Sequence, residues 1–186
     1  MPGRTKVSIL ALLVVACGAN PGDDTGARSP EVVGEGSSRE SRSVGSLADL
    51  ATCELLTSAE IEAATGVAPG PGQVERPVED APPMCQWPSA DGETEQLVHL
   101  IVTVNAYDDF ADLARAYEEE LGGALEGLRE IDGIGDFAAW AGDEQWGVLQ
   151  VYEGGRMLQV SAEPAAGRDR IAASRALAEK ALPRLR

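Results

Sequence analysis

The chain has 186 residues, of which 44% are hydrophobic and only 4% aromatic, and its formal net charge at pH 7 is −16. This length allows one domain of ordinary size rather than several. The large excess of acidic residues disfavours nucleic-acid binding, because phosphates attract basic surfaces.

Residues 1–16 have the order of a secretory signal peptide. Arg4 and Lys6 precede a mostly apolar run over 7–15, and the small residue Ala16 stands before Cys17. The apolar run is too short to span a bilayer. Its end resembles the lipobox of bacterial lipoproteins, which implies cleavage before Cys17 and a diacylglyceryl thioether on the sulfur of Cys17. The alternative is an ordinary secretory signal with a coincidental cysteine.

Residues 17–45 are expected to hold the lipidated Cys17 and a flexible linker. The stretch 18–45 is rich in Gly, Ser, Pro, Asp and Arg, and its few large apolar residues cannot build a core. As a flexible coil it would span about 30 Å. Two or more acyl chains anchor a protein stably, so we expect a lipid-anchored, extracytoplasmic protein of the cell envelope. Gly18 favours the outer membrane if the host has one.

Cys53 and Cys85 are the two cysteines of the domain predicted over 46–186. In an oxidising compartment such a pair favours a disulfide. Closing this loop would contribute about 3–4 kcal/mol to stability. The competing interpretation is two free thiols or a redox centre, although the spacing is unlike Cys-x-x-Cys.

A helix is predicted over 57–65. Thr57 and Glu60 have the spacing of a capping box, Leu56 and Ile61 that of a hydrophobic staple, and Gly66 is typical of a helix end. Residues 67–82 contain many prolines and glycines and are predicted to form a loop. A short strand over 85–87 follows.

Residues 97–105 alternate as a strand does, with Val98, Leu100, Val102 and Val104 on one face and His99, Thr103 and Asn105 on the other. A helix beginning at Asp108 or Asp109 is predicted to continue to 121, with its apolar residues at helical spacing. A turn over 132–135 and a strand over 137–141 come next.

Gly154-Gly155 predicts a two-residue hairpin turn. Glu153 would then face Arg156, and one face would carry Val151 opposite Leu158 and Leu149 opposite Val160. The other face would carry Tyr152, Met157, Gln150, Gln159, Val148 and Ser161. A last helix is predicted over 167–182, stopped or kinked by Pro183. Together these elements predict an α+β domain with a mainly antiparallel sheet, helices packed on one face and one disulfide.

The end of the chain is basic although the whole is acidic. The signal holds two of the 15 basic residues and none of the 31 acidic ones, so the mature chain has a net charge of −18. One interpretation of the basic end is a helix face that pairs with the acidic body and with the helix dipole. The other is contact with anionic lipid headgroups. The residues are Arg168, Arg170, Arg175, Lys180, Arg184 and Arg186.

Three short strings of the domain are similar to one family. They are Thr52–Ile61, with Cys53 before a Leu-Leu-Thr-x-x-Glu pattern, then Cys85-Gln86-Trp87, then Gly133–Ala138. They resemble small cell-envelope lipoproteins of unknown function, of the actinobacterial type, with C-x-L-L-T-x-x-E, a second cysteine before an aromatic residue and G-x-G-D-x-A. The resemblance implies a disulfide-stapled α+β lipoprotein domain and no established activity.

Candidate catalytic and cofactor motifs are weak. Gly133–Ala138 fits G-x-G-x-x-A but does not join a buried strand to a helix, as a dinucleotide loop must. His99 is the only histidine, no G-x-S-x-G occurs, and Asp132 and Asp136 lack the ligand spacing of a calcium loop. We therefore expect no enzyme, no catalytic residue, no metal site and no cofactor.

Trp140, Trp146, Tyr152 and Met157 cluster around the predicted hairpin in a chain poor in aromatic residues. If exposed, they would form a surface for an envelope protein or an apolar ligand; if helices cover both sheet faces, they are core residues. The expected function is a membrane-anchored, non-enzymatic protein- or ligand-binding domain. The alternatives are a carrier of lipid or another hydrophobic small molecule and, after it, an envelope enzyme.

Overall fold

The computed structural model describes residues 47, 50–76, 81–121, 127–143 and 145–185. The predicted signal peptide, Cys17 and the linker up to residue 45 lie outside the described residues, as does Arg186.

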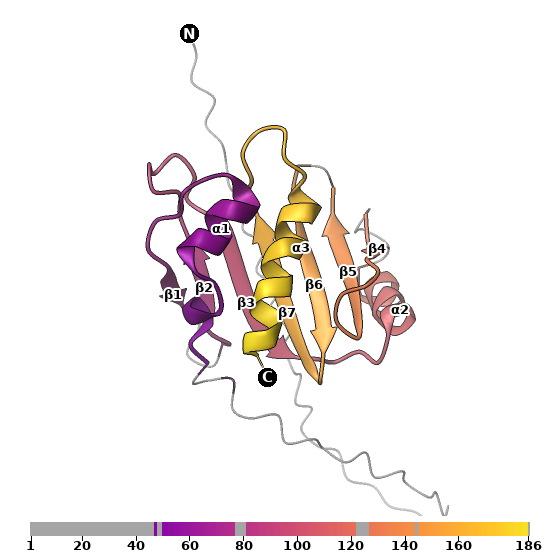
Figure 1. Ribbon diagram of the computed structural model, residues 1–186. Helices are drawn as coiled ribbons and strands as arrows, with labels where there is room; N and C mark the ends of the chain where they lie inside the picture. The colour runs from indigo at the N-terminus through magenta and orange to yellow at the C-terminus, as the bar shows by residue number, and fades with distance from the viewer. Residues whose placement is uncertain (1–46, 48–49, 77–80, 122–126, 144, 186) are drawn as a thin grey trace, which may run out of the picture. The chain divides into compact units, whose positions relative to one another are not determined.

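Seven strands form one antiparallel sheet within these ranges (Figure 1). Their order across the sheet is β1-β2-β3-β7-β6-β5-β4, so the last strand in the chain lies at the centre, beside β3. The strands are β1 (Gln73–Glu75), β2 (Met84–Trp87), β3 (Val98–Val104), β4 (Arg129–Glu130), β5 (Phe137–Gly142), β6 (Gly147–Glu153) and β7 (Arg156–Ala162).

Two helices, α1 (Ser58–Thr65) and α3 (Arg170–Ala181), lie side by side over one face of the sheet, in front of it in Figure 1. The short 3₁₀ helix η2 (Thr52–Leu55) precedes α1, and a second one, η3 (Leu182–Arg184), follows α3. We call this covered side of the sheet the helical face. The main core fills the space between it and the two helices. Its fully buried side chains include Ile61, Leu100, Trp140, Leu149, Val151, Leu158, Val160 and Leu177.

The helix α2 (Phe110–Leu121) packs against the other side of the sheet. Its Leu113 is fully buried in a second cluster with Ala139 of β5 and Tyr152 of β6. Successive strand residues point to opposite sides of a sheet, and the neighbours Trp140 and Val151 belong to the main core. The α+β prediction is therefore confirmed; α1 and α3 share one face as expected, while α2 covers part of the second.

The predicted capping box, the predicted end of α1 and the predicted hairpin are confirmed. Thr57 and Glu60 form the capping box, and Gly66 ends α1 in the left-handed conformation at φ 75°. The hairpin has the expected register, with Glu153 opposite Arg156 across the turn. The caps of α2 and α3 are Asp109 and Asp169, whose carboxylates accept N–H groups at 2.8 and 2.7 Å.

Two details differ from expectation. The stretch 67–82, predicted to be a loop, contains the edge strand β1, whose three residues are all exposed. Val104, expected to point inward with Val98, Leu100 and Val102, is 58% exposed as the last residue of β3.

The C-terminal end of the described chain is bound to the start of α1 through Arg184. Its guanidinium donates hydrogen bonds to both carboxylate oxygens of Glu60, at 2.7 and 2.8 Å, and to the carbonyl of Leu55 at 2.7 Å. These bonds with Arg184 lower the pKa of Glu60 from 4.5 to about 2, with a further contribution from Thr57.

This pair makes stability depend on pH. A carboxyl group whose pKa is lower in the folded chain stabilises the fold above its unfolded pKa, and that contribution disappears as pH falls through its folded pKa. We expect Glu60→Gln, which keeps the capping-box pattern, to be less stable than the parent at pH 6. The difference should shrink between pH 4.5 and about 2. Urea unfolding across this range checks it; a difference independent of pH would contradict the assignment.

Candidate functional site

The predicted aromatic surface around the hairpin does not form. Trp140 is fully buried in the main core, and Tyr152 is 1% exposed in the second cluster. Met157 packs against that second cluster, while Trp146 stands alone at the β5–β6 turn and is 64% exposed. Trp140 and Tyr152 point to opposite sides of the sheet, and α2 covers Tyr152. The prediction of one binding surface from these four residues is therefore wrong.

Tyr152 belongs to a buried polar network beneath α2. Its hydroxyl donates to Oε1 of Gln150 at 3.0 Å, and Nε2 of Gln150 donates to the hydroxyl of Tyr117 at 2.8 Å. The ring of Tyr152 stacks on Phe137 with centroids 4.2 Å apart. Burial raises the pKa of Tyr152, and the nearby Tyr117 and Tyr107 raise it further. The hydroxyl therefore stays protonated and serves as a donor.

Removal of this hydroxyl gives a measurable loss. Tyr152→Phe leaves the buried Oε1 of Gln150 without its donor, so we expect the free energy of unfolding to fall by about 1–2 kcal/mol. Met157→Leu conserves volume in the same cluster and should cost less than about 1.5 kcal/mol. Urea unfolding compares the two; no loss in Tyr152→Phe would show that the network adds nothing to stability.

The Gly133–Ala138 string forms a structural turn. Gly133 and Gly135 have φ of 75° and 65°, and Ile134 between them is 6% exposed in the main core. A Cβ on Gly135 would lie 2.6 Å from the carbonyl oxygen of Tyr152. The Asp136 carboxylate accepts the N–H of Gly154 at 2.9 Å, so it ties this turn to the β6–β7 hairpin.

The basic residues near the C-terminus mostly bind backbone carbonyls. Arg168 donates to Ala63 and Ala64 at the end of α1, at 3.0 and 3.2 Å. Arg175 donates to the carbonyls of Asp132 and Gly133, and Arg170 to that of Ala162. Arg175 and Arg170 also form ion pairs with Glu179 and Glu163, as Arg184 does with Glu60. These contacts support the interpretation in which the basic end pairs with the acidic body.

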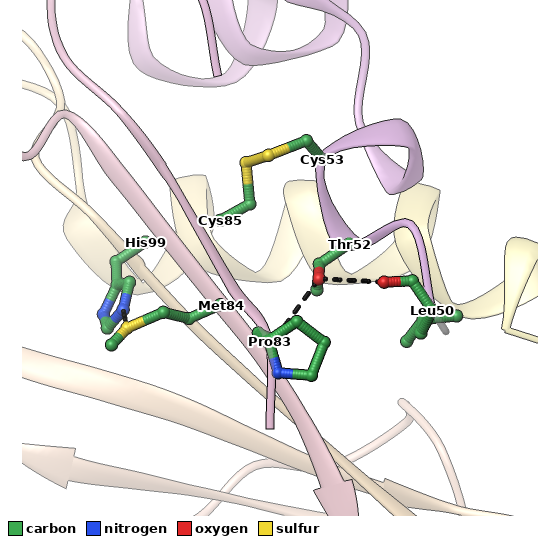
Figure 2. Close-up of a disulfide and its surroundings, with 7 residues drawn as sticks. All are labelled: Leu50, Thr52, Cys53, Pro83, Met84, Cys85 and His99. Carbon is green, nitrogen blue, oxygen red and sulfur yellow. Dashed lines mark hydrogen bonds between the residues drawn. A yellow bond between two sulfur atoms is a disulfide. The ribbon is translucent and has the colours of Figure 1, made fainter. Parts of the chain in front are cut away.

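The predicted disulfide is confirmed. Cys53 of η2 and Cys85 of β2 are joined, with their Cα atoms 5.1 Å apart (Figure 2). Beside the bond, the hydroxyl of Thr52 donates to the carbonyl of Pro83 at 3.3 Å. The disulfide and this hydrogen bond hold η2 against the start of β2.

The second side of the sheet has a part that α2 does not reach. Six partly exposed side chains of β2, β3 and β7 point to this side, because their strand neighbours are buried in the main core. The register places them in adjacent rows. We call them the open face: Met84, Gln86, His99, Ile101, Gln159 and Ser161. None of the six is Asp, Glu, Lys or Arg, although these four types make up 25% of the chain; Glu75 of the edge strand β1, opposite Met84, borders them.

His99 and Met84 touch each other on the open face. Nε2 of His99 lies 3.1 Å from Sδ of Met84 (Figure 2). Burial lowers the pKa of His99, and the charge of Glu75 acts in the opposite direction. The imidazole is therefore neutral near pH 7. His99 was expected only as a strand residue, and its contact with Met84 could not be inferred because the pairing of β2 with β3 was not predicted residue by residue.

No protein-family model matches the chain, and no curated protein is similar to it. Among the described residues, no helix is long and apolar enough to cross a membrane, and no three His, Cys, Asp or Glu side chains gather as metal ligands. The candidate site is therefore defined by its chemistry alone, and the family resemblance stays a prediction.

Proposed function

We propose that the protein is an envelope lipoprotein, anchored through Cys17, whose domain binds a partner protein through the open face and has no enzymatic activity. The observation that supports binding is the lack of charged side chains on the open face of a strongly acidic chain. The cores of protein interfaces are depleted in charged residues and enriched in Met.

The chemistry of the open face suggests the kind of partner. Gln86, Gln159 and Ser161 offer amide and hydroxyl groups, while Met84 and Ile101 offer apolar contact. A neutral surface with both apolar and hydrogen-bonding groups would complement them. Binding of such a partner would not remove water from an unpaired charge, a step that costs free energy.

Substitution at the centre of the open face tests the proposal. We expect Ile101→Lys to abolish capture of the partner by the tagged mature chain from solubilised envelope, since loss of a central contact costs about 2 kcal/mol or more. Val104→Lys is the matched control: it lies on the same strand, is 58% exposed and receives the same charge.

The captured material distinguishes the functions. A stoichiometric protein that is lost in Ile101→Lys and kept in Val104→Lys would support the proposal. Bound lipid without protein would instead favour a carrier of hydrophobic molecules. Equal capture by both variants would contradict a role for the open face.

A further inference from the structure

His99 and Met84 bring an imidazole nitrogen and a thioether sulfur together on the open face of the sheet. They occupy diagonal positions on neighbouring strands, since Met84 pairs with Ile101 and Gln86 pairs with His99. Nε2 and Sδ lie 3.1 Å apart. The sulfurs of Cys53 and Cys85 are joined in a disulfide and are not available as thiolate ligands. The Met84 thioether and the His99 imidazole take no part in that bond.

We propose that His99 and Met84 bind one soft monovalent metal ion, of the Cu(I) or Ag(I) class. Thioether sulfur selects soft ions such as Cu(I), and imidazole nitrogen also suits copper. Zinc is disfavoured here because its protein sites use thiolate, imidazole and carboxylate ligands, usually four in a structural site. The inference concerns the same face as the proposed function but does not depend on partner binding.

The tautomer of the imidazole decides which nitrogen can bind. A histidine binds a metal as the neutral imidazole, through the ring nitrogen that carries no proton. The binding tautomer carries its proton on Nδ1 and presents Nε2 to the ion. The carboxylate of Glu75, whose residue pairs with Met84 in the sheet, supplies negative charge near the imidazole.

The geometry requires only a side-chain adjustment. With bond lengths near those of zinc, about 2.0 Å to nitrogen and 2.3 Å to sulfur, a linear two-coordinate ion needs its donors about 4.3 Å apart. The unbranched Met side chain can change rotamer to provide this separation. The ion would replace the direct contact between Nε2 and Sδ.

Titration with Ag(I), which resists redox change, tests the site directly. The mature chain is used with Cys17→Ser, so that no free thiol competes, and with ¹³C-labelled methionine methyl groups. Its methionines are Met84 and Met157. We expect one equivalent of Ag(I) to shift the Met84 methyl and the His99 ring signals while the Met157 methyl stays in place.

Two matched variants complete the test. Met84→Leu should weaken Ag(I) binding by at least about tenfold, the loss seen when even an outer partner of a ligand is removed. The Met157 thioether contacts Gln159 and not an imidazole, so Met157→Leu should bind Ag(I) as the parent does. No saturable binding, or binding that survives Met84→Leu, would overturn the inference. Partner capture is measured separately, so either proposal can fail while the other holds.

Discussion

Loss of the Cys53–Cys85 bond is expected to lower the free energy of unfolding by about 3–4 kcal/mol. The bond closes a loop between cysteines 32 positions apart, which restricts the unfolded chain. It also fixes η2, whose Leu55 is 4% exposed in the main core. At the entropy of unfolding usual for a domain of about 140 residues, this loss corresponds to a Tm lower by roughly 10 °C.

The double variant Cys53→Ser/Cys85→Ser measures the effect by thermal and urea unfolding. Addition of a reductant is the control. The reductant should lower the stability of the parent to about that of the double variant and leave the stability of the double variant unchanged. A reduced parent as stable as the oxidised one would show that packing around η2 alone holds this part of the fold.

Replacement of Cys17 is expected to move the protein from the membrane to the soluble fraction. Two or more acyl chains give stable anchoring, and in the proposed function they are attached through Cys17. We expect Cys17→Ser to lose membrane association after an alkaline wash and to lose the lipid mass, with its domain folded as before.

The control for this prediction is a variant at a neighbouring position. Asn20→Ser alters the start of the linker and leaves Cys17 in place, so it should stay with the membrane. Cys17→Ser that remains in the washed membrane would contradict lipid anchoring and would favour the ordinary secretory signal with another means of attachment.

The parts of the fold that depend on neighbouring residues could be predicted from the sequence. The capping box of Thr57 and Glu60 and the hairpin at Gly154-Gly155 require only local hydrogen bonds and turn conformations. The disulfide could also be predicted, because the domain contains just one pair of cysteines.

The rest depends on pairings between distant segments. β1 pairs with β2 through its backbone while Val74 stays 58% exposed, so its sequence has no buried pattern to indicate a strand. The pairing of β3 with β7 joins residues more than 50 positions apart, and alternation does not say which strand lies beside which.

The candidate site shows the same limit. The alternation of residues predicted that Tyr152 and Gln159 point to the same side of the hairpin. It did not show how far α2 extends over that side. Tyr152 is buried under α2, whereas Gln159 is partly exposed beside Ile101 on the open face. The aromatic residues therefore predicted a surface in the wrong place. The open face could not be predicted, because its residues come from three strands whose pairing the sequence does not give.

The most direct measurement is photo-crosslinking of the full chain in the cells that express it. A benzophenone amino acid replaces Ile101 on the open face in one variant and Val104, on the same strand and pointing to the other side, in a second. Irradiation is expected to join one discrete protein to the Ile101 variant and none to the Val104 variant. The same products from both positions, or no protein product from Ile101, would contradict partner binding through the open face.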